Sequence, residues 1–138
     1  MTKKKQQPPV HAIEYRLLIT HKYNEQLKKT TILVALRTRE EFSNFTYEIV
    51  VNDTVQDGVL SLDLHGLRTP KHTIPSSGPA VFKKEFDHLN GVRKITVSKL
   101  GKELNVFTVK ILKDKVAVES TPEKPFVDMV TSEEEWQN

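Results

Sequence analysis

Residues 30–37 read Thr-Thr-Ile-Leu-Val-Ala-Leu-Arg, and this stretch decides the fold class. Its threonines, isoleucine and valine branch at Cβ, which restricts χ1 in a helical turn and suits the pleated surface of a strand. The apolar run Ile32–Leu36 has no polar interruption, so both faces of the strand are expected to be covered. We therefore predict a strand in the middle of a sheet, or one shielded by a neighbouring segment.

Runs with apolar residues at every second position lie on both sides of this stretch. Leu60, Leu62 and Leu64 alternate with polar residues, so we predict that the leucines face the core. The other runs cover residues 13–19, 45–51, 82–86, 92–97 and 107–111, with a short eighth at 116–118. Turn residues separate the runs, which is typical of an all-β domain. The predicted fold is an immunoglobulin-like antiparallel β-sandwich of seven to eight strands.

One hairpin has a strong local signal. Asn90-Gly91 lies between two alternating runs and is a favoured pair for a two-residue type I′ turn. The register of this hairpin would place Asp87 opposite Lys94, so an ion pair across the two strands is expected.

The two ends of the chain differ from its middle in composition. Residues 1–118 contain 20 Lys and Arg against 12 Asp and Glu, whereas residues 119–138 contain one Lys against six acids. Few apolar residues at either end can offset the entropy lost on ordering. We predict a disordered basic arm at 1–10, a β-sandwich domain at 11–119 and a disordered acidic tail at 120–138.

The chain offers little material for catalysis. It has no cysteine, which excludes a disulfide framework, a thiolate metal site and a cysteine nucleophile. Asp63 and His65 share one face of a predicted strand and His72 follows in the next loop, so these three are the candidate metal ligands. Scattered histidines without a ligand motif are more often surface residues. We therefore predict no enzyme activity, no metal and no cofactor.

The longest irregular stretch, residues 66–79, is a candidate binding loop. It contains three prolines, two glycines and two serines. Arg68, Lys71 and His72 make it basic, and Ser76 and Ser77 precede a glycine that would let backbone N–H groups bind an anion. The alternative is a plain connection between the two halves of a sandwich.

The acidic tail contains Trp136, the one tryptophan of the chain. An aromatic anchor on a disordered acidic peptide can dock into a basic groove of another protein. Two alternatives stay open: the tail folds back onto the basic body of its own chain, or it serves only solubility.

Together these features predict a non-catalytic module that binds a protein partner through loop 66–79, through the tail, or through both. The predicted contact residues are Arg68, Lys71, His72, Ser76, Ser77 and Trp136. One alternative is a basic protein associated with nucleic acid, although most aromatic residues fall on faces assigned to the core. Another is a small β-barrel that holds an apolar ligand.

The predicted location is cytoplasmic, without membrane insertion. The basic residues near the start of the chain precede no long apolar run.

Overall fold

The computed structural model describes residues 13–43, 46–69, 76–87, 89 and 91–138. This part of the chain is nearly all β-structure, which confirms the all-β prediction. Its elements are β1 (Tyr15–Asn24), β2 (Lys29–Phe42), β3 (Glu48–Gln56), β4 (Val59–Arg68), β5 (Gly78–Phe86), β6 (Lys94–Lys99), β7 (Glu103–Ile111), β8 (Val116–Ser120), β9 (Val127–Val130) and the short helix α1 (Glu133–Gln137).

The strands form one sheet in the order β8-β7-β6-β4-β3-β5-β2-β1-β9. Neighbours in sequence such as β1 and β2 pair antiparallel, whereas β4 with β6 and β1 with β9 pair parallel. β3 and β5 are joined by a single parallel residue pair, Glu48 opposite Val81. The purely antiparallel pairing expected of an immunoglobulin-like sandwich is therefore wrong, and the sandwich itself stays a prediction.

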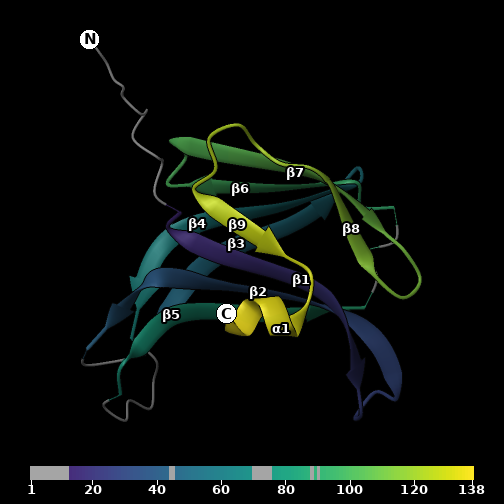
Figure 1. The fold of residues 1–138 in the computed structure, drawn as a ribbon, viewed down its shortest axis with the longest axis horizontal. Helices are drawn as coiled ribbons and strands as arrows, with labels where there is room; N and C mark the ends of the chain where they lie inside the picture. The colour runs from purple at the N-terminus through teal and green to yellow at the C-terminus, as the bar shows by residue number, and fades with distance from the viewer. Residues whose placement is uncertain (1–12, 44–45, 70–75, 88, 90) are drawn as a thin grey trace.

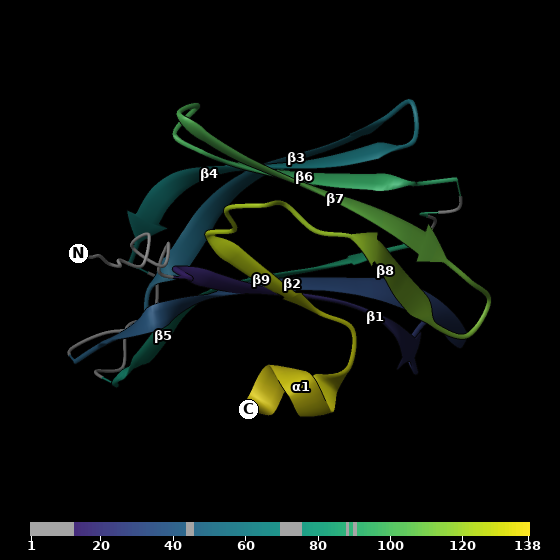
Figure 2. The same cartoon turned by 45° about the horizontal axis from the view of Figure 1, so that its top comes forward.

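The sheet curls on itself, so that its two halves face each other. In Figure 2, β3, β4, β6 and β7 lie above β1, β2 and β5. One apolar core fills the space between the halves, and the three leucines of β4 belong to it as predicted. Its fully buried members include Leu17, Ile19, Val34, Leu36, Leu60, Leu62, Ile95, Val97 and Phe107.

The outer face of β1 and β2 is covered as well. Leu18, Leu33 and Ala35 on this face form a second buried cluster with Val130 and Trp136. Figure 1 shows how this arises, with β9 beside β1 and α1 next to β2. Both faces of the 32–36 run are thus buried, as its composition predicts.

The hairpin predicted at Asn90-Gly91 is wrong. β5 pairs with β2, while β6 pairs with β4 and β7, so these two consecutive strands lie in different halves of the sheet. Asp87, expected opposite Lys94, instead forms an ion pair of 3.3 Å with Lys29. Asn90 itself lies outside the described residues.

The apolar run of β2 explains why β5 pairs with β2 instead of forming the predicted hairpin with β6. A strand buried on both faces must satisfy the backbone groups of both edges, and β5 supplies the edge opposite β1. A two-residue turn with type I′ signs occurs elsewhere, at Asp57-Gly58 between β3 and β4, where both residues have positive φ (53° and 78°).

The acidic segment 120–138, predicted to be disordered, contains β9 and α1. β9 runs parallel to the start of β1, from Tyr15 opposite Val127 to Leu18 opposite Val130. The few apolar residues of the segment are concentrated at buried positions, and β1 offers a free edge for backbone hydrogen bonds. The prediction failed because average composition does not show such an arrangement. The predicted arm at 1–10 lies outside the described residues.

Side chains join the far ends of the curled sheet. Asn105 of β7 is buried, and its Oδ1 accepts hydrogen bonds from the backbone N–H groups of Phe126 (2.8 Å) and Val127 (3.1 Å). Lys99 of β6 reaches Glu14, just before β1, at 2.6 Å. Side-chain contacts of this kind hold the two halves together at the side where no backbone ladder connects them.

Candidate functional site

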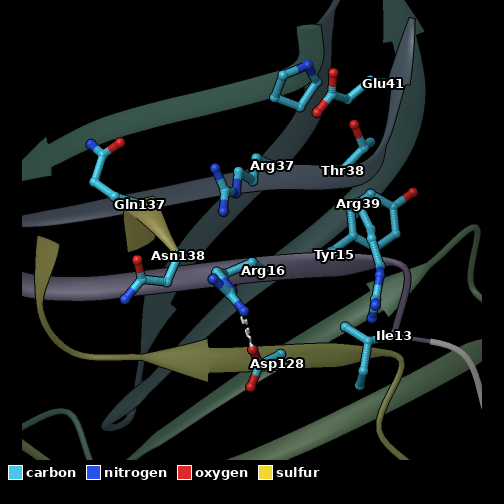
Figure 3. Close-up of a pocket in the computed structure, with 11 residues that line it drawn as sticks. Ile13, Tyr15, Arg16, Arg37, Thr38, Arg39, Glu41, Asp128, Gln137 and Asn138 are labelled. Atoms are coloured by element: carbon cyan, nitrogen blue, oxygen red, sulfur yellow. Dashed lines mark hydrogen bonds and ion pairs between the residues drawn. The ribbon is translucent and has the colours of Figure 1, made fainter. Parts of the chain in front are cut away.

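A pocket of about 390 Å³ opens where the starts of β1 and β9, the end of β2 and the C-terminal helix come together (Figure 3). Three arginines line it, Arg16, Arg37 and Arg39, against two carboxylates, Asp128 and Glu41. We call it the arginine pocket. The other lining residues are Ile13, Tyr15, Thr38, Pro79, Gln137 and Asn138.

A β-bulge in β2 shapes one wall. Arg37 pairs with Val81 of β5, and the next pair is Glu41 with Pro79, so three residues of β2 oppose one residue of β5. A bulge bends its strand and changes the direction of side chains. Arg39 lies within this bulge, at the margin of the pocket.

Thr38 holds the bulge in place. Its hydroxyl accepts a hydrogen bond from the N–H of Ala80 and donates one to the carbonyl of Glu40, both at 2.8 Å. Thr38 is buried, so the hydroxyl satisfies backbone groups that the regular ladder leaves unpaired here.

Arg16 and Arg37 lie directly opposite each other on β1 and β2. Like charges in this arrangement are destabilising, and each guanidinium has a contact that offsets the repulsion. Arg16 forms an ion pair with Asp128 at 3.2 Å and donates to the carbonyl of Glu135 at 2.8 Å. Arg37 lies over the ring of Trp136, 4.9 Å from its centroid.

The positive charge of the pocket is only partly compensated. Burial lowers the pKa of Arg37, the neighbouring charge of Arg16 lowers it further, and Glu41 acts in the opposite direction. Arginine nevertheless stays protonated at physiological pH. An anion bound near Arg37 would therefore be stabilised, because it would offset the repulsion between the Arg16 and Arg37 guanidinium groups.

Arg39 has a different environment. It is exposed, and within the described part of the chain its guanidinium makes no ion pair or hydrogen bond. Its backbone N–H donates to the carbonyl of Glu14 at 2.8 Å, which fixes the main chain while the side chain stays available. As far as the described residues go, the five N–H donors of this guanidinium have no partner and could bind a ligand.

A second space of about 480 Å³ adjoins the arginine pocket, and we call it the apolar hollow. The two spaces share Ile13, Tyr15, Thr38 and Arg39. The remaining residues that line the hollow are Glu14, Glu40, Phe42, Gly66 and Leu67. Arg39 therefore separates a polar space from one with aromatic and aliphatic walls.

Three of the loop residues predicted to bind a partner, Arg68, Ser76 and Ser77, lie outside both spaces. Arg68 forms an ion pair with Glu48 at 2.8 Å, and Ser76 shares a hydrogen bond of 2.6 Å with Thr46. Ser77 is exposed next to Ser76. These residues thus remain on the surface, and the described structure does not bring them together with the arginines.

Lys71 and His72 lie outside the described residues. Trp136, predicted as an anchor for a partner, is 9% exposed and packs on its own chain, which is the fold-back alternative. The predicted loop 66–79 begins and ends in strands, since β4 extends to Arg68 and β5 starts at Gly78. Its two ends border the site, because Leu67 of β4 lines the apolar hollow and Pro79 of β5 the arginine pocket.

The candidate metal ligands do not form a cluster where the structure describes them. Among the described residues, no group of three or more His, Asp or Glu side chains is placed to hold a metal ion. Asp63 accepts a hydrogen bond from the hydroxyl of Ser98, and His65 is exposed. His72, the third candidate, is outside the described range.

Sequence reasoning missed the arginines. Arg37 and Arg39 are two positions apart at the end of an apolar strand, which is a readable signal for two cations on one face. Arg16 joins them only through the register of β1 and β2, and the bulge that directs Arg39 has no local sequence signature.

Comparison with known proteins finds no matching family model, no matching curated protein and no matching solved structure. Over the described residues, no helix has the length and apolar character needed to cross a membrane. The cytoplasmic location stays a prediction.

Proposed function

We propose that the protein is a non-catalytic interaction module that binds an acidic segment of a protein partner in the arginine pocket. The observation that carries this proposal is the exposed guanidinium of Arg39, which has no acidic partner among the described residues and lines the same pocket as Arg16 and Arg37. Arginine binds carboxylates through paired, charge-assisted hydrogen bonds, which are stronger than neutral ones.

The surroundings of the pocket support a protein partner. Pro79, near the start of β5 where the predicted loop 66–79 ends, and Gln137 of the C-terminal helix both line the pocket. A segment bound there would touch the two regions that the sequence suggested, although through other residues than those predicted. The strands beneath the site would hold the arginines in place.

The hydroxyl groups of the pocket support a binding function rather than a catalytic one. The Thr38 hydroxyl is already engaged at both its donor and acceptor sides. Burial raises the pKa of Tyr15, so its phenol stays protonated and is a poor base or nucleophile at neutral pH.

We also propose that the two halves of the sheet act as the two layers of an immunoglobulin-like sandwich, joined at the β3–β5 corner.

The test is a titration of the full chain with a fluorescein-labelled Gly-Ser-Glu-Glu-Ser-Gly peptide at low salt, followed by fluorescence anisotropy. Replacement of Arg39 by Gln should weaken binding about tenfold, since a charge-assisted pair contributes on the order of 1.5 kcal/mol. The matched control is Arg93→Gln, because Arg93 is exposed beside the β3–β4 turn, away from the pocket. Equal losses in the two variants would mean unspecific attraction to a basic surface and would overturn the proposal.

A single-stranded oligonucleotide of matched charge distinguishes the nucleic-acid alternative. If the oligonucleotide binds more tightly than the peptide and Arg39→Gln weakens it, the pocket serves phosphates and the protein-partner proposal fails.

A further inference from the structure

The apolar hollow next to Arg39 limits which acidic segments fit the arginine pocket. Leu67 is 41% exposed at its wall, so part of an aliphatic side chain is open to a ligand there. Phe42 also lines the hollow and packs edge-on against Tyr47, with 5.2 Å between ring centroids. A rigid aromatic wall and an exposed leucine together form a surface that an apolar side chain would cover.

Arg39 links the two spaces physically. It lines both, together with Thr38 and Tyr15, so a carboxylate bound to Arg39 would lie at the entrance of the hollow. Figure 3 shows Arg39 beside Ile13, on the same side of the pocket as Tyr15. An occupant that holds Arg39 through an acidic group therefore places its neighbouring side chain within reach of the hollow.

The charged residues around the apolar hollow favour a partner segment with a single acidic group. Glu14, which also lines the hollow, is paired with Lys99 at 2.6 Å, and Lys99 is shared with Glu103 at 2.9 Å. Glu40 lies at the rim and is exposed, so it would repel a second acid placed deeper in the hollow. The cation that remains available is Arg39, and the region beyond it is suited to an uncharged, bulky side chain.

The chain itself shows that this face binds a peptide segment. Arg16 donates to the main-chain carbonyl of Glu135, and Arg37 lies over the ring of the adjacent Trp136. The carboxylate of Glu135 instead accepts hydrogen bonds from Ser132 and from the N–H of Thr131, so the segment lies on two of the three arginines through its main chain and its aromatic ring. Arg39 has no comparable partner within the described residues.

We infer that the partner segment carries a bulky aliphatic or aromatic residue directly next to its acidic residue, with the acid on Arg39 and the apolar side chain in the hollow between Phe42 and Leu67. This inference rests on the proposed function and adds the specificity of the site. A peptide, rather than a small amphiphilic acid, is the occupant we assign, because the same face already binds the main chain of Glu135.

Three labelled peptides of equal length test it against the full chain: Gly-Ser-Glu-Leu-Ser-Gly, Gly-Ser-Glu-Ser-Ser-Gly and Gly-Ser-Gln-Leu-Ser-Gly. We expect the Glu-Leu peptide to bind about fivefold more tightly than the Glu-Ser peptide, as burial of part of a leucine side chain predicts. The Gln-Leu peptide should bind weakest. Leu67→Ser should remove the advantage of Glu-Leu and leave Glu-Ser unchanged.

Leu104→Ser is the matched control, because Leu104 is 62% exposed on β7 and lies outside both spaces. Both leucines are exposed, so thermal unfolding should show that both variants fold.

Equal affinity for Glu-Leu and Glu-Ser would overturn the inference and leave the proposed function standing. Failure of every glutamate peptide would overturn the proposed function itself. Thermal stabilisation by decanoate without peptide binding would assign the site to a small amphiphile and overturn the peptide assignment.

Discussion

Asn105 shows how much of this fold depends on one polar side chain. It is 3% exposed, and its amide connects β7 to the segment that enters β9. The amide nitrogen also donates to the carbonyls of Leu104 and Lys124 at 3.3 Å each. An apolar replacement would leave two buried N–H groups without acceptors, which is the costly way to lose a hydrogen bond.

We expect Asn105→Leu to lower the free energy of unfolding by about 2–4 kcal/mol, measured by urea denaturation. Asn52→Leu is the control, because Asn52 is exposed in β3, and its effect should stay within about 0.5 kcal/mol. An Asn105→Leu protein as stable as the wild type would show that water or main-chain adjustment satisfies the freed groups.

The arginines mark the limit of sequence reasoning at this scale. Alternation predicted which leucines are buried, because the direction of a side chain follows directly from its position in a strand. Arg16 lies next to Arg37 only because β1 pairs with β2 in this register. Arg16 contacts Asp128 only because β1 pairs with β9, more than a hundred residues away in the sequence. No local pattern contains this information.

At the scale of elements, the bulge in β2 connects stability to the candidate site. We expect Thr38→Val to lower the free energy of unfolding by about 1–3 kcal/mol, because the N–H of fully buried Ala80 loses its acceptor. The variant should also bind acidic peptides less well, since Arg39 is placed by the same bulge. Denaturation and the anisotropy titration measure the two effects.

Thr38→Ser retains the hydroxyl and serves as the comparison. It should retain peptide binding and lose less stability than Thr38→Val. If valine and serine behave alike, the hydroxyl is not what maintains the bulge.

The strands themselves could be predicted from sequence, but several of their partners could not. All eight predicted runs overlap strands, because their periodicity is a local property. The Asn90-Gly91 pair suggested a hairpin, yet β5 crosses to β2, whose two buried faces require a neighbour on each edge. The pairing of β9 with β1 was missed because β9 is only four residues long and lies in an acidic segment.

At the scale of the molecule, contacts between the far ends of the sheet make its stability sensitive to alkaline pH. Lys99 joins Glu14 and Glu103 at 2.6 and 2.9 Å, and its hydrogen bond to Glu14 is the main cause of its raised pKa. A lysine with a raised pKa in the folded state stabilises the protein below its unfolded pKa and stops doing so as pH rises through the folded value. Burial raises the pKa of Tyr15, whose phenol ionises more readily in the unfolded chain.

Both groups act in the same direction, so we expect the free energy of unfolding to fall as pH rises above about 10. Tyr15→Phe and Lys99→Met should each make this decline shallower, as measured by urea denaturation at a series of pH values. Tyr23→Phe is the control for tyrosine, because Tyr23 is 58% exposed. An unchanged slope in both test variants would contradict this role for the contact region.

The parallel pairing of β9 with β1 also has a consequence for biosynthesis. Tyr15 pairs with Val127, so β1 acquires this neighbour only after more than a hundred further residues have left the ribosome. Until then Leu18 and Leu33 are not covered by Val130 and Trp136. Contacts between residues so distant in the sequence also form slowly. Until β9 and α1 emerge, the nascent chain therefore has an unpaired edge on β1 and exposed apolar side chains, and this is the stage at which a chaperone would protect it from aggregation.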